Sequence, residues 1–173
     1  MINNLLRGLF YFVVFVLIQV WILNNIHFLR VATPFLYLYF IVKLPVGTSQ
    51  TKIVFFSFLI GLVIDSFSNT PGMHAAACTL AGFSRDSLIH LFMGKDLPDG
   101  VYPSYKTFGY GGFFRYVITL VTIHHLVLFL VESLTFFDPL FLALRIITST
   151  ALTTILICTV EAFNIESQKS GES

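Results

Sequence analysis

Long apolar runs separated by short polar connections most restrict how this chain can fold. A helix rises about 1.5 Å per residue, so about 20 residues cross a hydrocarbon core of about 30 Å. Runs near that length occur at 5–23, 28–44, 50–67, 71–93, 112–131 and 139–163. We therefore expect an all-α polytopic membrane protein, a six-transmembrane-helix bundle over 1–163 with a short polar tail at 164–173. The run at 28–44 is the shortest, and whether it spans fully stays open.

Composition supports this environment and excludes several functional classes. Of the residues, 56% are hydrophobic and 11% are charged, far from the usage of soluble domains. The polar connections are too short to hold a soluble catalytic domain, so membrane lipid is the main surrounding that we expect. The formal net charge of +1 gives no field suited to nucleic acid.

Positive charges predict the orientation of the bundle. Lysine and arginine stay preferentially on the cytoplasmic side of a membrane. With six spans, the connections on the side of the N-terminus carry most of them, whereas the opposite connections have Arg30 and little else. The members of the first group are Arg7, Lys43, Lys52, Lys95, Lys106, Arg115 and Lys169. We expect both termini in the cytoplasm.

Three dipeptides mark expected helix starts on the opposite, outer side. An N-cap oxygen followed by proline at the first helical position is a favoured way to begin a helix. The three are Thr33-Pro34, Thr70-Pro71 and Asp138-Pro139.

Charged side chains inside the apolar runs form a candidate intramembrane network. Arg145 lies about two turns inside its run, where an isolated guanidinium is costly, so we expect it to pair with Asp65 or Glu132. Arg85 lies about two turns from the cytoplasmic end of the run at 71–93. It could extend to the membrane surface or pair with Glu161.

Small residues recur every three or four positions in the run at 71–93, including Ala75, Cys78 and Gly82. Such residues let two helix backbones approach closely. Two interpretations remain open, internal packing of the bundle and a groove for a partner's transmembrane helix.

Catalytic and metal-binding patterns are missing from the sequence. It contains no HExxH, CxxC, Walker or GxSxG motif. His124 and His125 are adjacent, so on a helix they point about 100° apart and cannot jointly hold one metal as an i, i+4 pair could. We expect no enzymatic activity, no catalytic residue and no metal or other cofactor.

A hairpin motif joins the runs at 50–67 and 71–93. It reads Gly-Leu-x-x-Asp, then a short turn with Pro71, then Gly-x-His-Ala, and its residues are Gly61, Leu62, Asp65, Gly72, His74 and Ala75. In this motif, in size and in the absence of a soluble domain, the chain resembles the rod shape-determining MreD family of bacteria.

The resemblance implies a non-enzymatic scaffold or adaptor subunit of the elongation machinery in the bacterial inner membrane. Such a subunit supports cell shape and lateral peptidoglycan synthesis beside MreC, the MreB filament, RodA and a penicillin-binding transpeptidase. The bulky first run suits large apolar contacts with a bitopic partner such as MreC. Candidate packing residues for partner helices are Phe12, Phe15, Cys78 and Gly82.

The MreD family is also similar to the substrate-binding subunits of energy-coupling-factor transporters, which gives an alternative function in vitamin or small-molecule transport. Those subunits dock their transport partner through Ala-x-x-x-Ala on the first helix. This chain has no alanine in 1–30, which departs from that pattern.

Overall fold

A computed structural model describes residues 13–21, 32–94, 97–134 and 138–170, with side chains described as far as residue 164. This part of the chain is helical and has no strand, as the sequence predicts. Residues 13–21 form one helical segment. The other helices are α2 (Leu38–Val42), α3 (Gln50–Ser68), α4 (Met73–Met93), α5 (Tyr105–Ser133) and α6 (Pro139–Ser170).

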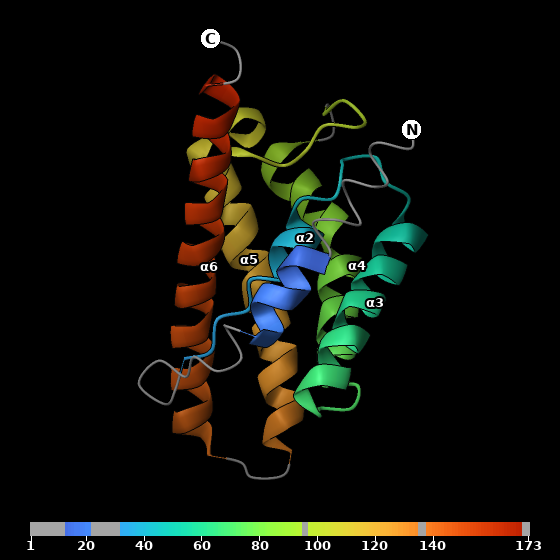
Figure 1. The fold of residues 1–173 in the computed structure, drawn as a ribbon, viewed down its shortest axis with the longest axis vertical. Coiled ribbons are helices and arrows are strands. Elements are labelled where there is room, and N and C mark those ends of the chain that lie inside the picture. The colour runs from blue at the N-terminus through green and yellow to red at the C-terminus, as the bar shows by residue number, and fades with distance from the viewer. Residues whose placement is uncertain (1–12, 22–31, 95–96, 135–137, 171–173) are drawn as a thin grey trace.

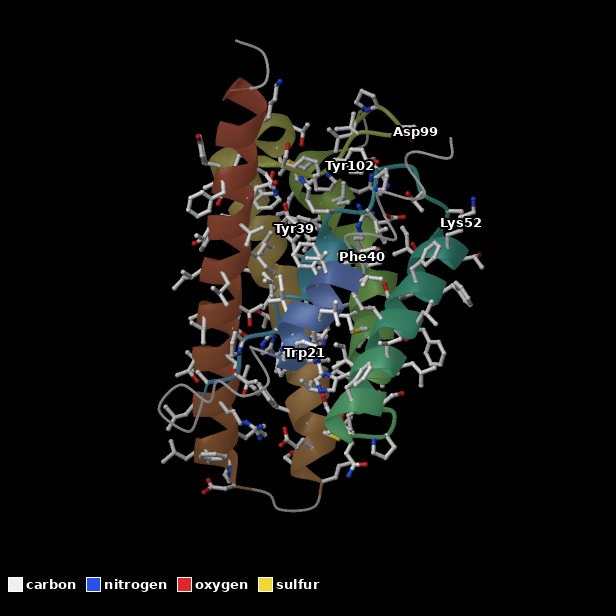
Figure 2. The ribbon with its side chains drawn as sticks, in the orientation of Figure 1. Trp21, Tyr39, Phe40, Lys52, Asp99 and Tyr102 are labelled. Carbon is white, nitrogen blue, oxygen red and sulfur yellow. The ribbon has the colours of Figure 1, made fainter. Side chains whose placement is uncertain are left out.

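The four long helices form two antiparallel pairs, α3 with α4 and α5 with α6 (Figure 1). Contacts between α4 and α5 join the pairs. The end of the bundle where α3 and α5 stop and α4 and α6 begin is called the hairpin end below. In Figure 2, Lys52, Asp99 and Tyr102 lie at the opposite end.

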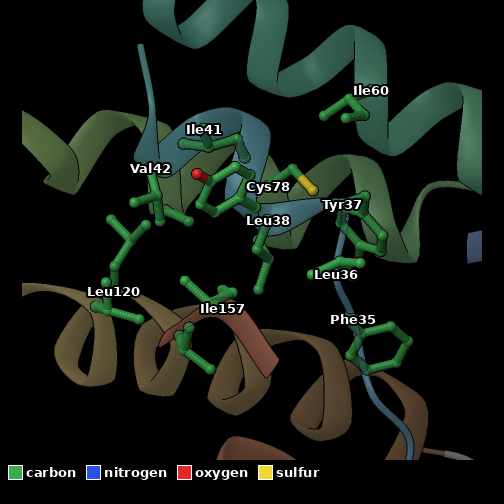
Figure 3. Close-up of a cluster of buried hydrophobic side chains, with 14 of the residues drawn as sticks. Phe35, Leu36, Tyr37, Leu38, Ile41, Val42, Ile60, Cys78, Leu120 and Ile157 are labelled. Atoms are coloured by element: carbon green, nitrogen blue, oxygen red, sulfur yellow. The ribbon is translucent and has the colours of Figure 1, made fainter. Parts of the chain in front are cut away.

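The short helix α2 occupies the centre of this arrangement. It contacts α3, α4 and α5. Tyr37, Leu38, Ile41 and Val42 are fully buried, and Figure 3 shows this segment surrounded by apolar side chains from the long helices, including Ile60, Cys78 and Leu120. The segment that looks weakest as a membrane span is therefore the core around which the other helices pack.

Among the described residues, three helices are long and apolar enough to cross a membrane: Gln50–Ser68, Tyr105–Ser133 and the part of α6 over Pro139–Asn164. The first and third begin at the predicted residues 50 and 139, whereas α5 begins seven residues before the predicted run 112–131. Helix α4 is also long, with 21 residues, but it carries Arg85, Asp86 and two histidines, which lower its mean hydropathy. The chain thus has the features of a membrane protein.

The prediction of one continuous helix over 28–44 needs correction. Residues 28–31 lie outside the described part, and from Ala32 onward the backbone is non-helical until Leu38. Pro34 explains the break, because proline disfavours helical geometry in the residue before it and cannot donate a backbone hydrogen bond. The segment 32–37 therefore carries backbone polar groups that other parts of the protein must satisfy.

The helix starts also differ from the expectation at two of the three dipeptides. Asp138 behaves as predicted, since its Oδ1 accepts hydrogen bonds from the amides of Leu140 and Phe141 at 3.0 and 3.2 Å. No helix begins at Thr33-Pro34. Helix α4 begins two residues after Pro71, at Met73, with Gly72 as its N-cap residue.

Candidate functional site

The carboxylate of Asp65 organises the α3–α4 hairpin. Its Oδ1 accepts hydrogen bonds from the Thr70 hydroxyl and the His74 amide, and its Oδ2 accepts one from the Ala75 amide, each at 2.9 Å. The amides belong to the first turn of α4, where backbone donors have no partner within the helix. A carboxylate also interacts favourably with the positive end of the helix dipole. Asp65, on α3, is thus the side-chain cap of α4.

Two features of the backbone allow this contact. Gly72 has φ +83°, a conformation that glycine adopts without strain, and it turns the chain into α4. A Cβ atom at Gly61 would lie 2.5 Å from the His74 carbonyl oxygen and 2.6 Å from Ala75 Cα. Only a glycine at position 61 lets α4 approach α3 this closely.

The remaining motif residues lie around this contact. Leu62 is 42% exposed, and Pro71 is also exposed. Both face outward from the hairpin, whereas Gly61, Asp65, His74 and Ala75 are buried. The buried motif residues determine the geometry of the hairpin.

His74 links the hairpin to the central segment. Its Nδ1 lies 2.7 Å from the Tyr37 hydroxyl, and the same hydroxyl lies 2.9 Å from Nε2 of His124 on α5. A hydroxyl has one proton to donate, so one imidazole must accept and the other must donate. His124 Nδ1 is buried with no partner. An unpaired N–H there would be costly, so His124 carries its proton on Nε2, and Tyr37 donates to His74.

A second group of polar side chains satisfies the non-helical backbone at 32–37. The Ser149 hydroxyl accepts from the Thr33 amide at 3.0 Å, and the Thr153 hydroxyl accepts from the Phe35 amide at 3.1 Å. Gln19 accepts from the Leu36 amide at 2.8 Å and donates to the Pro34 carbonyl at 2.9 Å. Non-helical backbone at membrane depth is tolerated where protein groups pair with it, and this segment meets that condition.

Arg85 stabilises the other end of the central segment. Its Nε donates to the Ile41 carbonyl at 3.0 Å, and its Nη2 donates to the Leu44 carbonyl. Its Nη1 pairs with Asp86 at 3.0 Å. The guanidinium thus satisfies carbonyls at the C-terminal end of α2, where positive charge is favourable.

The expectations for Arg85 and Glu161 are therefore wrong. Arg85 is fully buried and does not extend to the surface. Glu161, on α6, pairs with Lys43 at 3.1 Å and accepts a hydrogen bond from the Tyr39 hydroxyl at 2.6 Å. Arg85 bonds to carbonyls at the end of α2, whereas Glu161 bonds to Tyr39 and Lys43, so the two charged groups contact different parts of the central segment.

Arg145 lies at the hairpin end with Glu132 as its partner. Its Nη1 is 2.7 Å from Glu132 Oε1, and its guanidinium lies 4.6 Å from the centre of the Phe129 ring. Of the two carboxylates considered for Arg145, Glu132 makes the ion pair, and Asp65 caps α4 instead.

The candidate residues for partner helices lie mostly inside the bundle. Phe15 is 7% exposed and packs against Tyr39, and Cys78 is fully buried. Gly82 faces α3, where an added Cβ would overlap the Ser57 hydroxyl. The small residues of α4 therefore serve internal packing. Phe12 lies outside the described residues.

These contacts satisfy buried polar groups and hold the fold together. Within the described ranges, no three His, Cys, Asp or Glu side chains come close enough to hold a metal ion. The sequence does not identify Tyr37, Gln19, Ser149 and Thr153 as members of these polar contacts. Gln19, a polar residue inside an apolar run, and Pro34 were the available signals.

Fold and contacts together define the class, a helical membrane-type bundle built around a buried, partly non-helical segment. Comparison of the chain with protein-family models, with curated proteins and with solved structures gives no match.

Proposed function

We propose that this protein is a non-enzymatic subunit of the bacterial elongation complex, acting in the inner membrane as members of the MreD family do. The observation that supports the proposal is the α3–α4 hairpin. The residues that carry the resemblance meet in one structural unit, in which Asp65 caps α4, Gly61 admits the Ala75 backbone and His74 binds Tyr37. The motif residues determine how α3 and α4 pack. Such a structural role fits a protein that acts by contacting other proteins.

The proposed role is to dock a bitopic MreC-like protein and, directly or through it, the MreB filament, RodA and the penicillin-binding transpeptidase. Within the first apolar run, Phe15 faces the core, so it does not provide the docking surface. Val13 and Leu17 are 45% and 47% exposed and lie four residues apart, on one face of their helical segment. We place the contact with the bitopic partner on this face.

The six-span topology with both termini in the cytoplasm belongs to the same proposal, as does an architecture similar to that of the energy-coupling-factor subunits. The broken central segment comes close to the length of a span. Residues 32–35 advance about 3.3 Å per residue, and the turn and helix at 36–44 about 1.5 Å per residue, which gives about 27 Å against a hydrocarbon core of about 30 Å. In Figure 1 the segment runs from near the hairpin end toward the opposite end.

Gentle purification from native membrane tests the function. We expect MreC, RodA and the transpeptidase to accompany the wild-type chain. Val13→Ala combined with Leu17→Ala should lower recovery of the bitopic partner about fivefold or more, the loss that removing about 1 kcal/mol of contact energy produces.

The matched control is Ile147→Ala with Ile155→Ala on α6, where both side chains are also exposed, at 65% and 62%. This pair should leave recovery unchanged. Equal recovery from both double variants would contradict the proposed docking face. Recovery of an ATPase module with a bound vitamin, without elongation proteins, would favour the function of a transporter subunit over that of a scaffold.

A further inference from the structure

A cavity of about 370 Å³ lies at the hairpin end, and no part of the proposed function uses it. Its lining includes the apolar side chains of Phe35, Phe67 and Leu128. It also includes His74, Glu132 and Arg145 together with the hydroxyl residues Thr33 and Thr70. Apolar side chains combined with a small group of polar ones are the usual composition of a ligand site.

His74 lines this cavity and has a ring nitrogen that can donate a hydrogen bond. Tyr37 donates to His74 Nδ1 in the arrangement derived above, so a neutral His74 carries its proton on Nε2. His74 is 6% exposed and lines the cavity. Its Nδ1 is engaged by Tyr37, and no residue of the described ranges accepts a hydrogen bond from Nε2. Nε2 is therefore free to donate to an acceptor that a ligand supplies.

Arg145 adds further donors to the same cavity. A guanidinium has five N–H groups, and in the described part of the chain its ionic partner is Glu132, which meets Nη1. The Phe129 ring covers one face of the guanidinium without using the in-plane donors. The cavity therefore offers N–H donors of Arg145 that Glu132 does not engage. Phosphate oxygens suit such a set, because they are acceptors only and bind arginine strongly.

The depth of Arg145 fits the level of lipid phosphates. Arg145 stands six positions after Pro139, the first residue of α6, which is about 9 Å along the helix axis. The interfacial layer on each side of the hydrocarbon core is about 5 to 7 Å thick. With α6 entering the membrane at Pro139, the guanidinium lies near the boundary between headgroups and acyl chains.

We infer that this cavity binds the phosphate-bearing headgroup of a membrane lipid, with Arg145 and His74 as donors to the phosphate and the apolar lining residues against the start of the acyl chains. The volume, near the lower limit of about 300 Å³ for ligand pockets, fits a headgroup and excludes a whole lipid. In this arrangement Glu132 holds Arg145 in place and competes with the phosphate for its donors.

Native mass spectrometry of the purified full-length protein in mixed micelles tests this site. The probes are dioleoyl phosphatidylglycerol, dioleoylglycerol, which lacks the phosphate, and inorganic phosphate. We expect the phospholipid to remain bound and the other two not to. Arg145→Gln should weaken phospholipid binding about tenfold or more, the effect of losing a charge-assisted hydrogen bond. Glu132→Gln should strengthen it, because the competing carboxylate is gone.

The control is Arg115→Gln, an exposed arginine of α5 that bonds to its own helix at Gly111 and does not line the cavity. It should leave binding unchanged. The opposite signs expected for Arg145→Gln and Glu132→Gln separate lipid binding from a purely structural ion pair, which would weaken binding in both variants. Equal binding of dioleoylglycerol, equal effects of Arg145→Gln and Arg115→Gln, or saturation of the site by inorganic phosphate would each overturn the inference.

Discussion

The carboxylate of Asp65, near the end of α3, accepts a hydrogen bond from the backbone amide of His74, in the first turn of α4, at 2.9 Å. The same carboxylate binds the Ala75 amide and the Thr70 hydroxyl. This relationship explains why an ionisable residue stands at the end of an apolar run. The Asp65 carboxylate accepts hydrogen bonds from backbone amides at the start of α4, across the turn between the two helices.

Replacing Asp65 should therefore destabilise the hairpin. Asp65→Ala removes both oxygens and leaves two buried amides without a partner, so we expect a loss of about 3 kcal/mol in the free energy of unfolding. Asp65→Asn keeps one acceptor oxygen and should lose less unfolding free energy. Reversible unfolding in detergent measures the difference. Asp138→Ala is the control, because it removes an exposed cap, and it should cost about 1 kcal/mol. Equal losses for Asp65→Ala and Asp138→Ala would contradict the account.

Gly61→Ala should be strongly destabilising. The added methyl would meet the backbone of His74 and Ala75, which cannot move without shifting α4. We expect a loss of about 1 to 3 kcal/mol, as for overpacked cores. Gly111→Ala is the control, since the nearest atom to its added Cβ is the Arg115 side chain at 3.8 Å. This variant should be neutral or slightly stabilising, and a loss as large as that of Gly61→Ala would disprove the close-approach argument.

Tyr37→Phe should leave His74 Nδ1 and His124 Nε2 without their shared partner. We expect a cost of about 1 to 3 kcal/mol in unfolding free energy. Tyr110→Phe removes a hydroxyl from a residue that is 73% exposed and should cost little. Nitrogen-15 shifts of the imidazole rings provide a second measurement. In the wild-type protein they should show the His124 proton on Nε2, and a proton on Nδ1 would refute the hydrogen-bond assignment.

Arg85 should not be replaceable by other polar residues. Arg85→Gln removes the charge opposite Asp86 and the fork that donates to two carbonyls, so we expect a loss of about 3 kcal/mol or more. Arg85→Lys keeps the positive charge without the planar guanidinium, so it should lose less stability than Arg85→Gln. Arg115→Gln, at an exposed site, should have little effect. Full stability of Arg85→Gln would show that the end of α2 does not depend on this cap.

The sequence predicts the long helices well because their apolar runs have the length and composition of membrane spans. Helices α3 and α6 begin at the predicted residues, and Asp138 caps α6 as expected from its place before Pro139. These features depend on neighbours within a few positions in the sequence. Local patterns are enough to find them.

The central segment and the polar contacts could not be predicted in the same way. The break at Pro34 is local, but its partners Ser149 and Thr153 lie more than a hundred residues away. Arg85 reaches the carbonyls of α2 and not Glu161, because the position of α2 between the helix pairs places those carbonyls beside it. The charge of a side chain and its depth within an apolar run indicate that it needs a partner. Which residue becomes that partner depends on tertiary packing.

The central claim is that the buried hairpin residues shape the bundle and that the protein acts through contacts with other membrane proteins. Parallel measurement of unfolding free energy and of partner recovery for Asp65→Asn, Asp65→Ala and Gly61→Ala tests it most directly. The account predicts that recovery of elongation proteins falls in proportion to the folded fraction across the series. A variant that stays fully folded yet loses every partner, or one that unfolds yet retains them, would contradict it.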